Sequence, residues 1–253
     1  MKPIAIQLYT LREKAQKDFA GVLKSVADMG YAGVEPAGLY GLTPQDVRKR
    51  VADLGMVVSS FHGPFPTPEN LNEVLDQAKG LGTDTVVSGF GPDAFKTAEL
   101  IKAAADKVNL VTSKLAAAGV QLALHNHYWE FDKVNGRLGY DLLMEQCPGV
   151  KSELDVYWAA NFGACDPAKE VAKNKARTVL LHLKDGPLVK DQPMTAVGKG
   201  KVNIPAVIAA ADPKVLRWLI VELDACATDM TQAVADSYRY LVGQGLASGR
   251  KPA

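Results

Sequence analysis

Short apolar runs alternate along the chain with longer segments in which apolar residues recur every three or four positions, and this alternation occurs eight times. A continuous apolar run is typical of a buried strand, and the wider spacing is typical of an amphipathic helix. The predicted strands are Ile4–Thr10, Gly33–Ala37, Val57–Gly63, Thr85–Gly91, Gln121–His127, Val150–Val156, Thr178–Asp185 and Trp218–Ala225. The predicted helices are Phe19–Met29, Pro44–Leu54, Glu69–Leu81, Phe95–Ala118, Tyr140–Gln146, Pro167–Arg177, Ile204–Ala211 and Met230–Leu246.

Residues that start and stop helices support this division. Thr43 before Pro44, and Thr67 before Pro68, are each typical of an N-cap followed by proline at the first helical position. Four glycines follow helical segments directly, where a left-handed residue commonly ends a helix. These glycines are Gly30, Gly55, Gly82 and Gly119.

Eight strand–helix units in 253 residues predict a single α/β domain spanning residues 1–253, a (β/α)8 TIM barrel. The alternative is a doubly wound open sheet. A dinucleotide-binding version of that sheet would carry G-x-G-x-x-G after its first strand, where Gln7–Thr10 stands instead. No proline-rich or serine-rich linker divides the chain, which favours one domain.

Composition excludes several classes of protein. The chain is 47% hydrophobic and 23% charged, and 29 basic against 28 acidic residues leave a net charge of +1. This balance predicts neither a nucleic-acid partner nor a membrane partner. Three widely spaced cysteines favour free thiols, and the N-terminal segment lacks a signal-peptide core, so we expect a cytoplasmic protein. The chain contains no run of 18 apolar residues, so the sequence predicts no transmembrane helix.

Imidazole and carboxylate side chains gather at the carboxyl ends of the predicted strands, where a parallel barrel has its active site. A carboxylate in an apolar strand is costly to bury unless it is paired or binds a metal. A single such residue is more often structural, but Asp155, His182 and Glu222 converge from three strands and predict a divalent ion of the Mn, Mg, Co or Zn type. The four histidines are His62, His125, His127 and His182, and the carboxylates are Glu35, Asp155, Asp185, Glu222 and Asp224.

The chain resembles the sugar phosphate isomerase/epimerase family of xylose isomerase-like TIM barrels, and within it an HNHxxEF subgroup. The similar motifs occur in matching order from Gln7 to Glu222. They are QLYTLRE, GYAGVEPAGLYG, SSFHG, LALHNHYWEF, LDVYWAANFG, LLHLKD and GKGKV.

This resemblance implies one divalent ion held by residues of strands five to eight. Family members typically use a glutamate, an aspartate, a histidine and a glutamate in that order, and the last three correspond here to Asp155, His182 and Glu222. His125 stands at the position of the first glutamate, as in the HNHxxEF subgroup. The fourth ligand is then His125, His127 or a water molecule.

The resemblance also implies catalytic roles. The two glutamates serve as paired acid and base in epimerases, so Glu222 would retain one half of that pair. His127 is the candidate general base, since related dehydratases carry a catalytic histidine at this offset. Lys184 is expected to stabilise an enolate oxygen or a phosphate, with a solvated loop lysine as the alternative.

Aromatic residues beside the expected ligands suggest walls against the apolar face of a sugar ring, or else rings that merely cap the barrel. These are Trp129, Tyr157 and Trp158. The predicted substrate-binding residues are Glu35, His62, Asn126, Trp158 and Asp185.

Three further features allow a structural interpretation. Glu153 shares a strand face with Asp155 and is kept as structural. Glu130 could cap a loop backbone. Segment Gly186–Lys201 is either a lid or phosphate-binding loop, or a solvated charged loop.

We therefore expect an enzyme that removes a proton next to a carbonyl of a sugar, keto-sugar or sugar phosphate. Reprotonation would give an isomerase or epimerase, and loss of a β-substituent would give a lyase or hydratase. The alternative from another class is a non-catalytic carbohydrate-binding barrel. A homo-oligomer is compatible with the sequence, which does not specify the oligomeric state.

Overall fold

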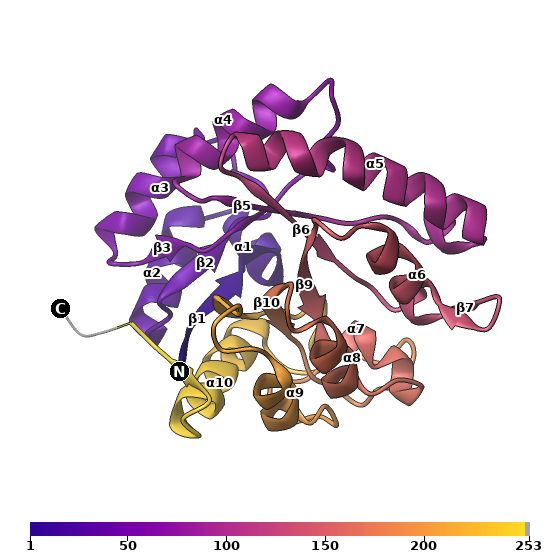
Figure 1. Ribbon diagram of the computed structural model, residues 1–253. Coiled ribbons are helices and arrows are strands. Elements are labelled where there is room, and N and C mark those ends of the chain that lie inside the picture. The colour runs from indigo at the N-terminus through magenta and orange to yellow at the C-terminus, as the bar shows by residue number, and fades with distance from the viewer. Residues whose placement is uncertain (251–253) are drawn as a thin grey trace.

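A computed structural model describes residues 1–250 of the chain, and its centre is a parallel β-barrel surrounded by helices (Figure 1). The strands pair in the order β3-β2-β1-β11-β10-β9-β6-β5-β4. Their bounds are β1 Lys2–Gln7, β2 Gly33–Glu35, β3 Val57–Val58, β4 Phe61–His62, β5 Thr85–Ser88, β6 Gln121–His125, β9 Lys151–Asp155, β10 Thr178–Leu183 and β11 Trp218–Val221.

The two ends of this strand order, β3 and β4, are halves of one predicted strand, Val57–Gly63. β3 pairs with β2 and β4 pairs with β5, so this segment joins the sheet edges. Between the halves the backbone N–H of Ser59 donates to the carbonyl of Val34. The barrel prediction is confirmed, and the open doubly wound alternative is wrong.

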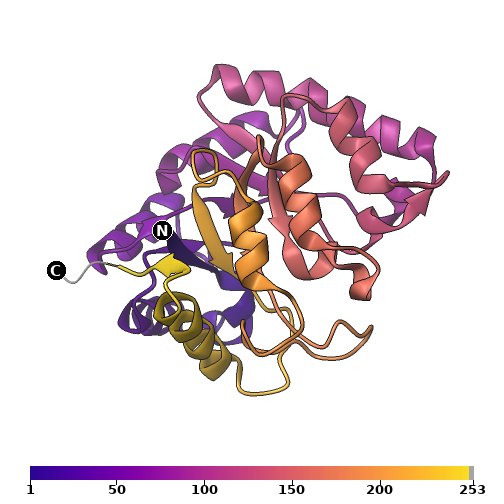
Figure 2. The same cartoon turned by 60° about the horizontal axis from the view of Figure 1, so that its bottom comes forward.

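All eight predicted helices form, and their surrounding ring is seen from a second side in Figure 2. Thr43 caps its helix as predicted, with its hydroxyl accepting the Asp46 N–H at 3.1 Å. The four predicted glycines all adopt positive φ after their helices. The bounds are α2 Phe19–Met29, α3 Pro44–Asp53, α4 Leu71–Leu81, α5 Ala98–Ala117, α6 Gly139–Gln146, α8 Pro167–Asn174, α9 Ile204–Ala210 and α10 Met230–Gly243.

Several predicted boundaries are wrong. Helix α4 begins at Leu71 after Asn70, so the prediction of Thr67 as its N-cap is wrong; Thr67 and Asn70 instead hydrogen-bond each other in the preceding turn. The predicted helix Phe95–Ala118 is a 3-10 turn, η2 (Pro92–Phe95), followed by α5 with Thr97 as its N-cap. Each predicted strand also ends one to four residues earlier than expected, because the chain turns there into the loops and short helical turns of the barrel mouth.

The short elements not predicted by periodicity lie between or after these units. A two-stranded hairpin, β7 (Lys133–Val134) and β8 (Arg137–Leu138), turns at Asn135 and Gly136, both with positive φ. This Asn-Gly pair is a recognisable hairpin signal in the sequence. Near the chain end, β12 (Ala247–Ser248) pairs with β1, so the two terminal regions lie side by side. Five short helical turns lie after β1, after β9 and in the loop after β6: η1 Leu8–Leu11, α1 Arg12–Ala15, η3 Trp129–Phe131, α7 Val156–Ala159 and η4 Asn161–Gly163.

The core has two parts because side chains alternate along each strand. Outward residues such as Ile4, Leu122 and Leu219 pack against the helices in the larger cluster. A smaller apolar cluster belongs to the alternate strand positions and fills the barrel near its amino-terminal end. It comprises Ala5, Val87, Ala123, Val179, Leu180 and Ile220. The next inward positions toward the mouth are polar, and they build the site.

Candidate metal and catalytic site

Four side chains from four strands meet at the carboxyl end of the barrel. His125 and Asp155 end β6 and β9, His182 lies in β10, and Glu222 follows β11 directly. Their candidate ligand atoms all lie within 4.8 Å of one another. His125 Nε2 is 3.4 Å from Asp155 Oδ2, and His182 Nδ1 is 2.7 Å from Glu222 Oε2. The residues predicted to bind metal are therefore brought together, with His125 rather than His127 as the fourth member.

The donor atoms of this cluster fit a divalent cation. Asp155 Oδ2, Glu222 Oε2, His182 Nδ1 and both ring nitrogens of His125 are buried and have no hydrogen-bond partner, because their close approaches are not aligned as hydrogen bonds. Buried polar atoms are normally satisfied, so such a group requires explanation. Two imidazoles and two carboxylates without thiolate are a donor set that suits Mn, Co or Zn.

Lys184 brings a positive charge to the same carboxylates. Its Nζ lies 3.1 Å from Asp155 Oδ2, 2.8 Å from Glu222 Oε2 and 2.8 Å from Asp224 Oδ2. Only 1% of the residue is exposed, so the solvated-lysine interpretation is wrong. Burial alone would lower the pKa of Lys184, but the three carboxylates outweigh it and hold that pKa well above its usual range. The side chain is a fixed cation at the barrel mouth.

The two clustered imidazoles differ electrostatically. Burial, followed by the charges of His182 and His62, lowers the pKa of His125 well below its ordinary value, so His125 is neutral. Burial would do the same at His182, but Glu153 and Glu222 outweigh it and raise the pKa of His182. A neutral imidazole is the form that ligates a metal, so a bound cation would have to displace one proton from His182, whereas His125 is already neutral.

Glu153, which sequence analysis left outside the site, touches it. Its Oε2 lies 3.0 Å from Nε2 of His182, while Glu35 Oε1 lies 3.3 Å from the same nitrogen. Neither glutamate has exposed surface. Burial and the neighbouring Glu35 raise the pKa of Glu153 well above its usual range. The only sequence signal for this contact is the shared strand face of Glu153 and Asp155.

His127 lies beyond the end of β6 and outside the four-residue cluster. Its ring stacks on Trp129, with centroids 4.2 Å apart, and lies 5.0 Å from the ring of His125. Its backbone N–H donates to Glu130 Oε2 at 3.0 Å, which confirms Glu130 as a loop cap. Burial and then Lys184 lower the pKa of His127, so the imidazole is neutral near pH 7 and can accept a proton.

The residues predicted to bind substrate lie in different surroundings. The amide of Asn126 donates to the Asp155 carbonyl at 3.1 Å and accepts the Asp155 N–H at 3.0 Å, so both of its ends are used. Glu35 has no exposed surface. The ring of His62 stands 5.3 Å from that of His125 and is half-buried. His62 is therefore more exposed to solvent than Asn126 or Glu35.

Trp158 is the half-buried aromatic residue beside the cluster. Its backbone N–H donates to Asp155 Oδ1 at 2.9 Å, and Lys184 Nζ lies 5.6 Å from its ring centroid. The ring also neighbours those of Tyr128, at 5.8 Å, and Phe162, at 6.2 Å. These contacts form an aromatic side to the barrel mouth.

Asp185 anchors the loop that follows β10. Its Oδ1 accepts the backbone N–H groups of Gly186 and Val202, and its Oδ2 accepts those of Gly198 and Gly200, all at 2.8–3.0 Å. Asp185 is fully buried. The predicted segment Gly186–Lys201 is thus tied at both ends to one carboxylate, rather than being a freely solvated loop.

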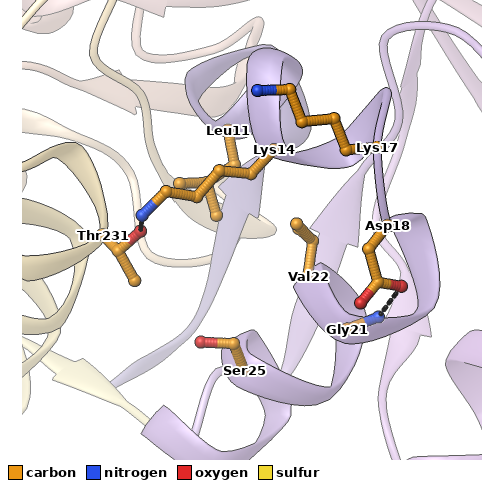
Figure 3. A pocket seen from close by; sticks show the side chains of 8 residues that line it. All are labelled: Leu11, Lys14, Lys17, Asp18, Gly21, Val22, Ser25 and Thr231. Carbon is orange, nitrogen blue, oxygen red and sulfur yellow. Dashed lines mark hydrogen bonds between the residues drawn. The ribbon is translucent and has the colours of Figure 1, made fainter.

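A separate pocket of about 430 Å³ lies on the outside of the barrel, between the first helical segments and α10 (Figure 3). Lys14 reaches across it to the hydroxyl of Thr231. None of the polar residues of the barrel mouth lines this pocket. Within residues 1–250, we find no helix with the length and apolarity needed to cross a membrane.

Comparison with known proteins decides the family. A family model described as "Xylose isomerase-like TIM barrel" matches residues 23–241, which is most of the chain. The chain belongs to the xylose isomerase-like TIM barrel family. The resemblance to that superfamily is thereby confirmed, whereas the HNHxxEF subgroup stays a prediction.

Solved structures of similar fold cover nearly the whole chain. A sugar phosphate isomerase/epimerase from Parabacteroides distasonis is 25% identical, with a TM-score of 0.79 over 98% of this chain and 96% of that one. An L-ribulose 3-epimerase is 19% identical (TM-score 0.66; 97% and 95% covered). A probable 3-DHS dehydratase from Bacillus anthracis is 12% identical (TM-score 0.73; 96% and 99% covered). The last two show the fold alone, and no curated protein matches the chain.

Proposed function

We propose that this protein is a divalent-metal-dependent isomerase or epimerase of a sugar, keto-sugar or sugar phosphate. One observation carries the proposal: His125, Asp155, His182 and Glu222 bring buried donor atoms together at a barrel mouth, in close charged contacts but without aligned hydrogen bonds. Similarity to a sugar phosphate isomerase/epimerase supports the substrate class. A non-catalytic carbohydrate-binding barrel would have no need for such a costly group of charges.

The four clustered residues would hold one ion, which supplies a Lewis acid that orients and polarises neighbouring carbonyl and hydroxyl oxygens. His127 is the proposed general base, because its neutral imidazole can take the proton from the carbon between those oxygens. Glu222 would assist proton transfer on the reacting carbon. Lys184 would stabilise negative charge on the substrate oxygen, since its ammonium is already fixed at the mouth.

Substrate contacts are proposed for the polar and aromatic residues around this centre. Trp158 would cover the apolar face of the sugar ring, and its half-buried position leaves part of the ring free. His62 would contact hydroxyl groups. Glu35, Asn126 and Asp185 complete the predicted set, and their buried hydrogen bonds favour roles in supporting the site. Nothing in the charge balance favours a nucleic-acid substrate.

The runner-up is a lyase or dehydratase of a keto-sugar or keto-glycoside. It is favoured by His125, which stands in the cluster where relatives of the predicted type carry a glutamate. Stereochemical inversion needs two well-matched bases, and this substitution removes one carboxylate. The chemistry up to proton removal is shared by both reactions.

The test combines metal content with proton exchange. Protein purified without chelators should retain about one Mn, Co or Zn per chain, and Glu222→Gln should lose most of it, whereas Glu145→Gln, an exposed control, should not. In heavy water, a substrate keto-sugar should gain deuterium next to its carbonyl, and His127→Ala should slow this exchange by about 10²–10⁴-fold. Equal metal retention by Glu222→Gln would remove that ligand. An absence of exchange across sugars and sugar phosphates would favour the binding-barrel alternative.

A further inference from the structure

His182 has carboxylates on both sides of its ring. Nδ1 lies 2.7 Å from Glu222 Oε2, toward the proposed metal cluster. Nε2 lies 3.0 Å from Glu153 Oε2 and 3.3 Å from Glu35 Oε1, on the opposite side. The ring has no exposed surface.

Glu35 and Glu153 have no exposed surface. Ser60 donates its hydroxyl to Glu35 Oε2 and lies 3.2 Å from the hydroxyl of Ser59. Both oxygens of Glu153 lack a conventional hydrogen-bond partner. Two carboxyl groups at such a place are costly to bury. His182 contacts both of them, and Nδ1 of His62 lies 3.9 Å from Glu35 Oε1.

We infer that Glu35 and Glu153 are positioning residues of the proposed metal centre that hold the Nε2–H of His182 and leave Nδ1 free to ligate. Glu35 Oε1 is in hydrogen-bonding geometry with Nε2, and Glu153 Oε2 is the nearer oxygen, at 3.0 Å. A neutral imidazole has one N–H donor and one acceptor nitrogen. Glu222 also faces Nδ1, so the ring keeps its proton on Nε2, with the lone pair on Nδ1, when a cation occupies the Nδ1 side and the carboxyl groups at Nε2 accept the N–H. Carboxylates in this position commonly orient metal-bound histidines and increase their basicity. This inference rests on the proposed function.

Strand geometry explains why one short segment can supply both parts. Glu153 and Asp155 are two residues apart on β9 and so lie on the same face. Across the β9–β10 pairing, Asp155 is opposite His182 and Glu153 is opposite Leu180. The single strand thus brings a ligand to the mouth and an orienting carboxyl group one level below it.

A second ion between Glu35, Glu153 and His182 is a competing explanation for the same geometry, since these three residues could also ligate a metal. That arrangement would require His182 to use both nitrogens as ligands. The two explanations differ in metal stoichiometry and in the protonation of Nε2, so both quantities can be measured directly.

Zinc is a suitable probe because it is diamagnetic, and the chain has only four histidines to assign by ¹⁵N NMR. Zinc affinity would be measured by chelator competition in wild type, Glu153→Leu and Glu153→Gln. The matched control is Glu170→Gln, a buried glutamate paired with Lys173 on α8. We expect about 10–100-fold weaker zinc binding in Glu153→Leu and near wild-type binding in Glu153→Gln and the control. In zinc-loaded wild type, Nε2 of His182 should remain protonated.

The positioning role would be overturned by wild-type zinc affinity in Glu153→Leu, by zinc on Nε2, or by two zinc ions per chain. Should Glu153→Leu not fold, the NMR measurement on wild type decides the matter. Failure of wild type itself to bind zinc would instead remove the metal centre of the proposed function, so the two failures are distinguishable.

Discussion

The two ends of the barrel interior are built from the same strands but from opposite kinds of side chain. On β6, Ala123 lies in the apolar floor and His125 at the charged mouth; β10 repeats this with Leu180 and His182. Ile220 of β11 packs in the floor, and Glu222 follows two residues later. Along each of these strands, the inward position two residues closer to the mouth therefore carries an ionisable side chain in place of an apolar one.

This difference shows how one strand can serve stability and function at once. The floor removes apolar surface from water, which stabilises the fold. At the mouth, buried charges oppose folding unless they are paired, and their pairing with Lys184 and His182 limits that cost. Substitutions at the two ends should thus separate stability from metal binding.

The largest expected effect is at the floor. Ile220→Ala should lower the free energy of unfolding by about 2–4 kcal/mol, because it leaves a cavity among fully buried neighbours. Urea denaturation of metal-free protein measures this loss. Leu100→Ala, at an exposed site on α5, is the control and should change little. Folded Ile220→Ala should retain zinc affinity; weakened zinc binding with unchanged stability would contradict the division between the two ends.

An effect of comparable size is expected from the mouth loop as pH rises. Burial raises the pKa of Glu130 to about 8, above its ordinary value of 4.5. Its stabilising contribution is therefore full below about pH 4.5 and is lost as pH rises through about 8. From pH 5 to 8.5, the wild type should lose about 2–4 kcal/mol of unfolding free energy relative to Glu130→Gln. Parallel pH profiles of the two proteins, measured by urea denaturation, would refute this assignment.

The smallest expected effect is local and concerns the loop tied to Asp185. Asp185→Asn leaves one oxygen for four backbone N–H groups and should cost about 1–3 kcal/mol. Hydrogen exchange of Gly186, Gly198 and Gly200 should accelerate, whereas Asp191→Asn, exposed in the same loop, should leave it unchanged. Unchanged protection with a raised KM would support direct substrate contact instead.

Local patterns in the sequence determined the order of the eight strand–helix units and many of their ends. Periodicity reports which face of an element is buried, and residues such as Thr43 and Gly30 end helices through bonds to near neighbours. The alignment of polar residues at strand termini followed from the same local reasoning. It was enough to identify Asp155, His182 and Glu222 as cluster members before any distance was known, whereas the choice between His125 and His127 as the fourth member stayed open until the structure was available.

Only the tertiary structure decided which of these side chains touch and which are closed to solvent. Strand register places Glu153 against His182, and the loop after β10 folds back so that Gly198 and Gly200 meet Asp185. Barrel closure also buries Lys184 among carboxylates from β9 and β11. These contacts join residues far apart in the chain, and their energies depend on burial and angle. Periodicity and composition specify neither the burial of these contacts nor their angles, because burial and angles are set only when the sheet closes into a barrel.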